Sequence, residues 1–378
     1  MFLKKQFKPI LDISFYTPNA LKGHEENDKN AIIFYIENDD VKYAIFDYEN
    51  DVFMKKTIAH KVMHLPFCYQ YALAEFLQFV STVHGTRETF DIDADGSFDV
   101  YNKKDGTHLK NVSLKSCNET QEPLNFELED SRELSVEKAK DLSRFLSLTK
   151  RFSCDIPYFE AFNQPALLQE NGLKLISTDG VHAFVYQITN NLTDRKSSKD
   201  FFIGKNNKHS QNTIKILSTF LSIIENDLHI RLTDKYLSLQ NKYDEINIPL
   251  NPNNDFSGEG QLYQEKEDKV IATWNQETMT QITDMLNAKA LSASRKANNF
   301  KNSLEVICLL DLDSALIEFD GNCEELNEIS YESPQNYAPV VVCCYHLSEF
   351  IRILLELKVK EVQVYGDRIE GNEYRMYF

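Results

Sequence analysis

The chain has 378 residues, 42% hydrophobic and 12% aromatic, so it can bury substantial cores and is not an intrinsically disordered chain. Its length favours two or three domains, and its 12 glycines are few for a glycine-rich nucleotide-binding protein. The formal charge of -17 would repel nucleic acid if it were spread evenly, but it leaves room for a basic patch inside an acidic shell.

The seven cysteines form no CxxC pair, which favours a reduced, cytoplasmic protein. The first residues are basic, but Pro9 and Asp12 interrupt any apolar run, so we expect no signal peptide. No stretch approaches 18 consecutive apolar residues, and we therefore expect no membrane span.

The first third of the chain predicts a short opening element, a hairpin and then a helix followed by a second hairpin. Residues 1–18 fit a helix or a strand, although Pro9 disfavours a long helix. Residues 41–58 read as strand, polar turn and strand. An amphipathic helix and a hairpin follow over 71–101. The apolar positions of this helix are spaced i, i+3, i+4, i+7: Leu73, Phe76, Leu77 and Val80.

The middle third predicts two helices and two hairpins. Ser135 is the expected N-cap of a helix, although Lys138 stands where a full capping box has Glu. The inward stripe of this helix is Leu142, Phe145, Leu146 and Thr149. Residues 173–188 predict two strands joined by a tight Asp-Gly turn. A helix and hairpin follow from 213, with the apolar phase kept by Ile214, Leu217 and Leu221 and with Ser218 at the fourth place.

The last third repeats the pattern. A helix begins after Asn275, its expected cap, and carries the stripe Met279, Ile282, Met285 and Leu286. A hairpin is expected over 304–319, although its position in the repeat matches less well. A final helix and hairpin run from 346, with apolar positions at Leu347, Phe350, Ile351 and Leu354.

The same helix-and-hairpin unit thus recurs three times at intervals of domain length. Polar stretches near 116–123 and 251–260 read as linkers at the two expected boundaries. We therefore predict an α+β protein of three similar domains. Their expected bounds are 1–120, 134–250 and 265–378.

Several motifs in this order are similar to the bacterial DNA polymerase III beta subunit family, the β sliding clamps. In that family a hairpin Ala-Thr-Asp-Gly-His-Arg-Leu follows a strand pair containing Leu-Asn-Gly. This chain has "ISTDGVHAF" about fifteen residues after "AFNQPALL", and "FFIGKNNK" where the family has a strand ending in Pro-Arg/Lys. It departs from the family at Val181-His182-Ala183, at Gly204 in place of Pro, and in its "EYRMYF" tail. These departures are typical of a divergent member, such as one encoded by a phage or mobile element.

The resemblance implies three repeated clamp domains, with helices lining a central hole and antiparallel sheets outside. Two chains would close head to tail into a homodimeric ring that encircles duplex DNA, with sheets continuing across the subunit contacts. Such a protein is a DNA replication processivity factor in the cytoplasm of a bacterial cell or phage-infected host. Its partners would be a DNA polymerase and a clamp loader, both docking through short peptide motifs. The family has no catalytic residue, and no cofactor or metal is implied.

The resemblance also places two sets of residues. Grip on DNA would be loose and independent of sequence, through cations on the helices. The expected DNA-binding residues are Lys138, Arg144, Lys150, Arg151, Lys205, Lys208, Lys215, Lys289, Arg295, Lys296 and Arg352. The helix from 73 has no basic residue, so its repeat would use Lys4, Lys5 or Lys8. The expected partner-peptide pocket comprises His182, Ala183, Ile203, Gly204, Tyr374 and Met376. Ordinary solvated helix faces remain the alternative interpretation of the cations.

Other candidate sites are weaker. Residues 91–102 have the acidic spacing of a calcium loop, but Asn102 replaces the bidentate Glu, so a plain Asp-Gly hairpin is favoured. His60 and His64 lack an HExxH pattern, and Cys117 and Cys154 have no evident His partner. Trp274 is interpreted as a packing anchor.

Two alternatives to the clamp stay open at this point. One is an enzyme of unknown reaction with a carboxylate site between repeated α+β domains. The other is a clamp-like decoy that binds polymerase peptides without encircling DNA.

Overall fold

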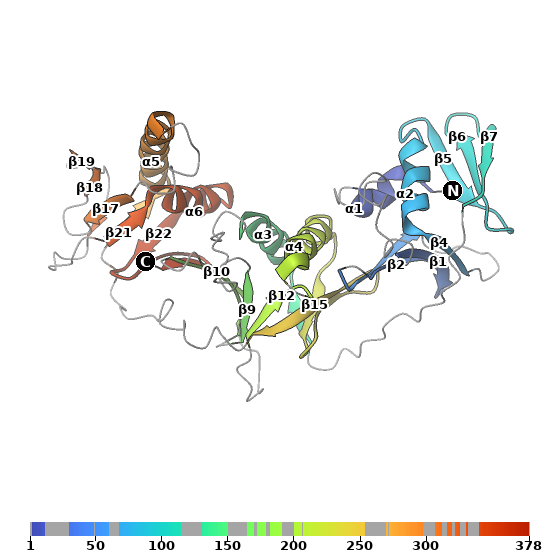
Figure 1. Ribbon diagram of the computed structural model, residues 1–378, viewed down its shortest axis with the longest axis horizontal. Helices are drawn as coiled ribbons and strands as arrows, with labels where there is room; N and C mark the ends of the chain where they lie inside the picture. Colours follow the sequence, from blue (N-terminus) through green and yellow to red (C-terminus); the bar gives the residue numbers. More distant parts are fainter. Residues whose placement is uncertain are drawn as a thin grey trace. The chain divides into compact units, whose positions relative to one another are not determined.

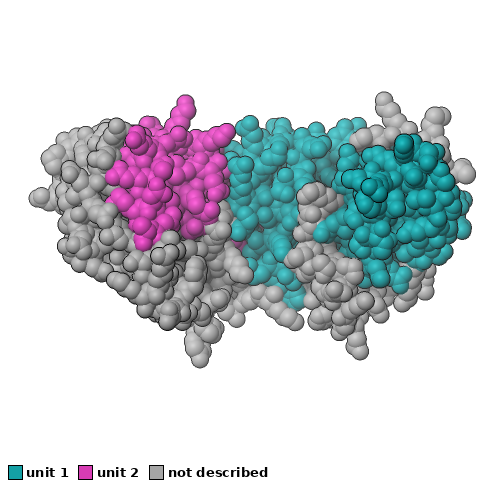
Figure 2. All heavy atoms as spheres, turned by 90° about the horizontal axis from the view of Figure 1, so that it is seen from above, with its two compact units in different colours: residues 1–147, 201–252 teal, residues 148–200, 253–378 magenta. Residues whose placement is uncertain are grey.

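The computed structural model describes residues 2–11, 30–48, 50–59, 68–114, 131–149, 165–169, 172–178, 182–190, 200–205, 207–253, 270, 272–297, 307–311, 316–319, 322–325, 330–331 and 340–377. They belong to two compact units, coloured in Figure 2: Met1–Ser147 with Phe201–Pro252, and Leu148–Asp200 with Asn253–Phe378. The middle repeat is therefore shared between the units.

Helices and strands follow one another in three similar series (Figure 1). The first series is η1 (Lys4–Phe7), α1 (Lys8–Leu11), β1 (Ala31–Glu37), β2 (Asp40–Asp47), β3 (Val52–Ala59), β4 (Cys68–Ala72), α2 (Leu73–Thr82), β5 (Glu88–Ile92), β6 (Phe98–Asn102) and β7 (His108–Val112). The second is β8 (Arg132–Leu134), α3 (Val136–Thr149), β9 (Ala166–Gln169), β10 (Leu173–Thr178), β11 (Ala183–Thr189), β12 (Asp200–Ile203), α4 (Asn207–Ser222), β13 (Leu228–Leu232), β14 (Tyr236–Gln240) and β15 (Asp244–Asn253). The third is β16 (Ala272–Asn275), α5 (Gln276–Ala297), β17 (Ile307–Asp311), β18 (Leu316–Phe319), β19 (Asn322–Glu325), β20 (Ser330–Tyr331), β21 (Val340–Cys343), α6 (Cys344–Glu356), β22 (Glu361–Val364), β23 (Arg368–Gly371) and β24 (Tyr374–Tyr377).

Equivalent strands pair in equivalent ways, and all these pairs are antiparallel. One sheet runs β4-β1-β2-β3 in the first repeat and β21-β17-β18-β19 in the third, and the middle repeat has the order β9-β10-β11. A second sheet runs β5-β6-β7, then β8-β13-β14-β15, then β16-β22-β23-β24. In the first repeat Phe2 takes the place of a full strand beside β5, through a bridge to Phe90. This repeated topology confirms the expected α+β fold.

The helices form where apolar residues recur on one face and capping groups precede them. Ser135 Oγ accepts a hydrogen bond from the Lys138 amide (3.3 Å), and Asn275 Oδ1 accepts one from the Thr278 amide (2.9 Å). Both predicted N-caps are thereby confirmed. The predicted stripes of α2, α3, α4 and α6 are buried, as are Met279, Ile282 and Leu286 of α5.

Two pairs of helices pack against each other (Figure 1). Between α3 and α4, Ser143 Oγ donates to the Ser218 carbonyl (2.6 Å) and Ser218 Oγ donates to the Ser143 carbonyl (2.9 Å). Between α5 and α6, Ser348 Oγ donates to Asn287 Oδ1 (2.8 Å). These reciprocal bonds satisfy the hydroxyls of buried Ser143 and half-buried Ser218, and they explain why a serine interrupts the apolar phase of α4.

The first repeat has an aromatic core, which holds its N-terminal segment in place. The ring of Phe7 lies 5.2 Å from that of Phe76 and 5.5 Å from that of Phe90, and Phe34 also lies 5.2 Å from Phe76. All four side chains are fully buried. The ambiguous opening segment is therefore a short helical turn whose Phe7 completes this core.

The hairpins expected over 41–58, 91–102, 173–188 and 304–319 all form. One boundary differs from the expectation, because β15 continues to Asn253, into the stretch interpreted as a linker.

Candidate functional site

Strands continue across a boundary between repeats in the first unit. β15 pairs antiparallel with β3, with Asp244 opposite Lys56 and Glu245 opposite Lys55. The Thr57 amide also donates to the Tyr243 carbonyl (2.8 Å). We call this pairing the β3–β15 seam. It extends one sheet edge with another, so neither edge is left open to foreign strands.

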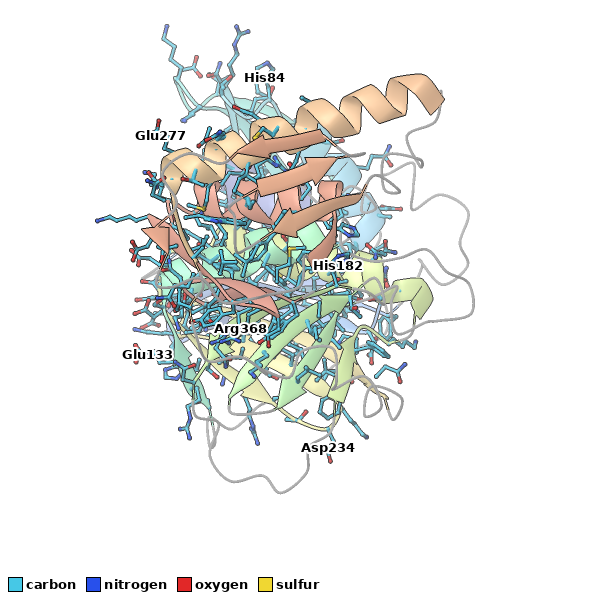
Figure 3. The ribbon with its side chains drawn as sticks, turned by 90° about the vertical axis from the view of Figure 1, so that its left-hand side faces the viewer. His84, Glu133, His182, Asp234, Glu277 and Arg368 are labelled. Carbon is cyan, nitrogen blue, oxygen red and sulfur yellow. The ribbon has the colours of Figure 1, made fainter. Side chains whose placement is uncertain are left out.

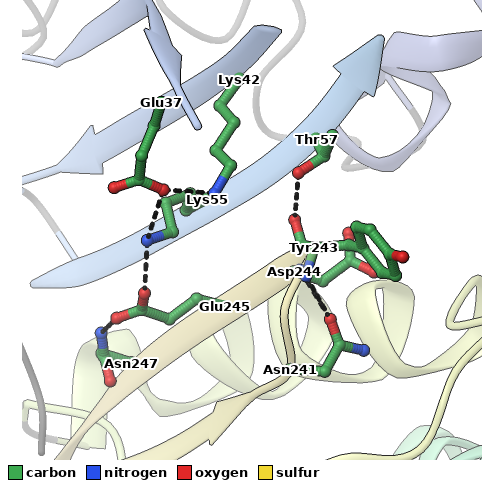
Figure 4. A network of polar contacts seen from close by, with 9 residues as sticks. All are labelled: Glu37, Lys42, Lys55, Thr57, Asn241, Tyr243, Asp244, Glu245 and Asn247. Carbon is green, nitrogen blue, oxygen red and sulfur yellow. Dashed lines mark hydrogen bonds and ion pairs between the residues drawn. The ribbon is translucent and has the colours of Figure 1, made fainter. Parts of the chain in front are cut away.

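Opposite charges face each other on this seam, and Figure 4 shows the pair Lys55–Glu245. Lys56 Nζ lies 2.9 Å from Asp244 Oδ1, and Lys55 Nζ lies 3.1 Å from Glu245 Oε2. The two acidic side chains are only 6% and 7% exposed. Asn247 Nδ2 donates to the other oxygen of Glu245 (3.0 Å). Because both carboxylates are withdrawn from water, each depends on its lysine for compensation.

A third carboxylate extends this network at the edge of the seam (Figure 4). Glu37 accepts a hydrogen bond from Lys42 and lies 4.0 Å from Lys55 Nζ. The hydrogen bond from Lys42, helped by the charge of Lys55, holds the pKa of Glu37 below its ordinary value. Protonation of Glu37 is therefore coupled to folding.

The second unit contains an equivalent seam of different chemistry. β24 pairs antiparallel with β11, with Phe184 opposite Met376 and Tyr186 opposite Tyr374. The rings of Tyr186 and Tyr374 stack with centroids 4.8 Å apart and planes inclined by 22°. We call this pairing the β11–β24 seam. Aromatic and apolar side chains hold it together, where the first seam uses ion pairs.

Two outer strands that correspond to the seam strands have one edge without a partner strand among the described residues. β7 is an outer strand of the sheet β5-β6-β7, and β19 is an outer strand of the sheet β21-β17-β18-β19. β7 exposes residues 108–111. Its Leu109 is 48% exposed, and no other large hydrophobic side chain of the described residues is classed as exposed. An exposed edge with an apolar side chain is a surface available for pairing.

The described cations expected to bind DNA sit on or beside the helices, off their buried stripes. Arg144 of α3 and Lys215 of α4 are exposed, as is Lys205 just before α4, and Lys138 is half-buried. Arg144 has only a weak contact to Asp141 on its own helix (3.4 Å). The side chains of Lys150, Arg151, Lys208, Lys289, Arg295 and Lys296 lie outside the described residues.

Two basic residues near the helices have a local structural role. Arg352 contacts Glu349 (2.6 Å) and Glu356 (3.2 Å) on its own helix, so its charge is largely balanced. Lys4 Nζ donates to the carbonyls of Ser81 and Val83 (3.1 Å each) at the C-terminus of α2. A cation there satisfies carbonyls that the helix leaves unpaired. Lys4, one of three lysines considered for a DNA face in the first repeat, is thus a cap of α2.

The residues expected in a partner-peptide pocket fall in both units. In the second unit His182 precedes β11 and Ala183 begins it, while Tyr374 and Met376 lie on β24, where they pair with Tyr186 and Phe184. All four are buried, and His182 packs against the ring of His346 at 5.7 Å (its position is labelled in Figure 3). Ile203 ends β12 in the other unit, Gly204 follows it, and both are also buried. Asp179, Gly180 and Val181 lie outside the described residues.

Gly204 has a clear structural reason to differ from the proline of the resembling family. Its φ is +110°, and a Cβ would lie 2.8 Å from Ser210 Cα. Its amide donates to the Pro249 carbonyl (2.8 Å). Proline has neither the amide hydrogen nor access to positive φ, so it cannot stand here.

The weaker candidate sites have local explanations where they are described. In the turn between β5 and β6, Asp95 Oδ1 accepts the Ser97 amide (2.8 Å), and hydrogen bonds to Ser97 lower the pKa of Asp95. Gly96 has φ +83°, as the predicted hairpin turn requires. Trp274 is fully buried, which confirms it as a packing residue. His60, His64, Cys117 and Cys154 lie outside the described residues.

The seam residues were not identified from the sequence. The signal that could have found them is a pair of adjacent lysines, Lys55-Lys56, inside the largely apolar strand β3, and a pair of adjacent acids, Asp244-Glu245, at the start of β15. Charges in such positions need a partner, since a strand buried on both faces offers no solvent to them. Two pairs of adjacent residues of opposite charge, in strands of different repeats, indicate that these strands pair edge to edge.

Within the described part of the chain, no helix is both long and apolar enough to span a membrane. The same residues hold no group of three His, Cys, Asp or Glu side chains that could bind a metal ion.

Comparison with known proteins locates this fold. No protein-family model and no curated protein sequence matches the chain. Solved structures match it over almost its whole length. The DNA polymerase sliding clamp of Bacillus subtilis has a TM-score of 0.66 at 12% identity, over 99% of this chain and 96% of that one. The DNA polymerase III subunit beta of Pseudomonas aeruginosa has 0.65 at 9% identity, over 99% and 97%.

A structure from Eubacterium rectale described as a putative DNA polymerase III beta subunit has a TM-score of 0.64 at 13% identity, over 100% of this chain and 97% of that one. These matches extend through all three repeats of the chain. The chain therefore has the fold of the bacterial DNA polymerase III beta subunit, the β sliding clamp.

Proposed function

We propose that the chain is a divergent member of the sliding clamp family and acts as a processivity factor in DNA replication. The observation that carries this proposal is the likeness to bacterial clamps along the full chain, in all three repeats. The proposed domains are residues 1–120, 134–250 and 265–378. Two copies would join head to tail and encircle duplex DNA in the cytoplasm of a bacterial or phage-infected cell.

The free strand edges support a closed homodimer. Each seam inside the chain joins the outer strand of one repeat's first sheet, β3 or β11, to the outer strand of another repeat's second sheet, β15 or β24. Among the described strands, the corresponding outer strands β19 and β7 have an edge without a partner. A chain with two complementary open edges forms either a closed ring or an open filament. Two copies would satisfy both edges in a ring of six repeats.

The exposed cations of the helices support a loose grip on DNA. Arg144 and Lys215 lie on α3 and α4, and Lys205 lies close by. Together with the remaining expected cations, they would contact phosphates without reading bases, and added salt would weaken this contact. The ring would then stay on DNA because it encircles the duplex and cannot dissociate from it without opening.

The proposed role of the ring is to hold a DNA polymerase at its template. Tethering raises the local concentration of the polymerase without tight binding to DNA. A clamp loader would open the ring, and both partners would dock short peptides near the β11–β24 seam. No catalytic step is assigned to the chain.

Electron microscopy of the purified chain in negative stain, classified without imposed symmetry, tests the architecture. We expect closed six-lobed rings with an open centre, at concentrations where sedimentation shows a dimer. Compact dimeric particles without a hole would overturn the proposal.

Binding to DNA provides an independent test. We expect weak binding to short linear duplexes, equal for unrelated sequences and reduced by salt. Replacing Arg144 and Lys215 together by Glu should lower binding to all sequences alike and flatten the salt dependence. Lys235→Glu with Lys242→Glu, at two exposed lysines that flank β14, makes the same change of charge and is the matched control. Unchanged binding by the double variant would exclude α3 and α4 as the DNA face.

A further inference from the structure

The helices of the three repeats differ in charge. α4 contains no acidic residue, and α3 contains three basic and two acidic residues. α2 has one acidic and no basic residue, and α6 has two acidic residues and one arginine. Residues 276–288, the part of α5 whose side chains are described, contain two acidic residues and no lysine or arginine. Among α2 to α6, as far as their side chains are described, a net positive helix thus occurs in the middle repeat alone.

α3 and α5 occupy equivalent places in their repeats, and their N-caps align them residue by residue. The fifth and ninth residues after the cap are Lys140 and Arg144 in α3, but Thr280 and Asp284 in α5. All four side chains are exposed. A phosphate that is attracted by Arg144 would therefore be repelled at the corresponding place of α5.

α4 differs in the same way from α2 and α6, its counterparts in the other repeats. The residue after the first position of the apolar stripe is Lys215 in α4, Ala74 in α2 and Ser348 in α6. Lys215 is exposed, whereas Ser348 is buried and donates its hydrogen bond to α5. The solvent-facing side of α4 also holds three uncharged polar side chains, Gln211, Thr219 and Ser222. Such side chains beside a lysine can contact DNA phosphates without reading bases.

Several cations beside the helices of the other repeats are already engaged. Arg352 of α6 contacts two acids of its own helix, so this group as a whole is negative and attracts a phosphate weakly. Of the two lysines of η1, Lys4 donates to the carbonyls at the end of α2, and Lys5 is exposed. The described helix surfaces of the first and third repeats therefore offer little positive charge to a duplex.

We propose that the middle repeat holds the DNA and that the helices of the first and third repeats do not. Phosphates would be contacted by Lys140 and Arg144 of α3 and by Lys215 of α4. Lys140 was not among the cations expected from the sequence. The inference rests on the proposed function, because it names the part of each copy that touches the duplex. By the two-fold symmetry of a homodimer, the two middle repeats lie on opposite sides of the ring, so the duplex has two equivalent places to bind.

The acidic helices would restrict the duplex to these two places. Repulsion between a carboxylate and a phosphate acts over roughly one Debye length, about 8 Å at physiological salt, so a duplex close to α5 or α6 would be repelled. A ring that contacts few phosphates releases few counterions, and its affinity for DNA then depends only moderately on salt. Few contacts also favour sliding along the duplex, because each step breaks few of them.

Neutralising two matched sets of cations tests this assignment. The middle-repeat set is Lys140→Gln, Arg144→Gln and Lys215→Gln. The third-repeat set removes the same charge from the last turns of α5, through Lys289→Gln, Arg295→Gln and Lys296→Gln. The measurement is the affinity for a short linear duplex at a series of salt concentrations. We expect the middle-repeat set to reduce the slope of log affinity against log salt by about 2–3, at about 0.9 for each phosphate contact, and the third-repeat set to leave the slope unchanged. Lys5→Gln with Arg352→Gln should also leave it unchanged.

Cross-linking provides a measurement that does not depend on removing charge. The photoreactive residue p-benzoylphenylalanine is placed at Gln211 of α4, at Gln78 of α2 or at Thr280 of α5, which are all exposed. After irradiation with the duplex at low salt, we expect cross-links from the position in α4 and at least tenfold fewer from those in α2 and α5.

The outcomes separate this inference from the proposed function. Equal circular dichroism and melting temperature would show that all variants fold. A wild-type chain that binds no duplex even at low salt would overturn the proposed function. A wild type that binds, with a slope reduced equally by the middle-repeat and third-repeat sets, would overturn the assignment to the middle repeat and leave the clamp assignment intact. Cross-links from Gln78 or Thr280 as abundant as those from Gln211 would do the same.

Discussion

The β3–β15 seam permits a quantitative prediction at Lys55. Replacing Lys55 by Met keeps most of the aliphatic chain but removes the charge that lies 3.1 Å from Glu245. Glu245 is 7% exposed and would retain only the hydrogen bond from Asn247. Leaving a buried charge unpaired costs about 3–5 kcal/mol. Because Lys55 itself is 18% exposed, we expect about 2–3 kcal/mol here.

Amide hydrogen exchange is the appropriate assay, since a chain of several domains does not unfold in one step. Local opening of the seam by about 2–3 kcal/mol corresponds to exchange faster by roughly 30- to 150-fold in β3 and β15. The amides of the β11–β24 seam serve as an internal reference, and Lys235→Met is the matched control. Adding Glu245→Leu to Lys55→Met should recover most of the protection, because an apolar pair needs no compensating charge.

Exchange in β3 and β15 that changes by less than about threefold in Lys55→Met would refute this reasoning. It would mean that water or Glu245 itself compensates for the missing lysine, and that the ion pairs of the seam contribute little to its stability.

Three further predictions concern single residues. The pKa of Glu37 is lowered in the folded chain, so the ionised side chain stabilises the fold fully above pH 4.5, its ordinary pKa, and this stabilisation is lost as the pH falls below 4.5. Glu37→Gln should therefore flatten the acidic part of the curve of melting temperature against pH. Gly204→Ala should destabilise its repeat by about 1–3 kcal/mol in thermal melting, because of the positive φ and the contact with Ser210, and an unchanged melting temperature would contradict this. Ser135→Ala should cost about 1 kcal/mol through the lost N-cap of α3, whereas Ser135→Asp should retain stability.

The local elements were predictable from the sequence because their signals are local. Helix stripes such as Leu73, Phe76, Leu77 and Val80, and the caps Ser135 and Asn275, lie within a few turns of one another in the chain. The repetition of these signals was enough to predict an α+β protein of repeated units. The resemblance of the hairpin over 173–188 to a hairpin of the β sliding clamps then indicated the correct fold.

Contacts between distant segments were harder to predict. Nothing local in β3 specifies that it pairs with β15, since the choice depends on which edges remain open after each sheet forms. The same holds for Lys4, whose contact with the end of α2 requires the two segments to be brought together by the aromatic core. The end of β15 at Asn253 also escaped prediction, because its polar and proline-containing sequence is typical of a linker.

The β11–β24 seam has a consequence for how the chain is made. Tyr186 meets Tyr374, so 188 residues (374 − 186) must be synthesised after β11 before its partner strand exists. At ribosomal rates of about 5–20 residues per second, this takes roughly 10–40 s. During that time β11 is paired with β10 on one side only, so the nascent chain carries an open strand edge of apolar and aromatic residues, the kind of segment that chaperones bind. Synthesis of β24 is therefore the step that covers this edge of β11 and removes its tendency to aggregate.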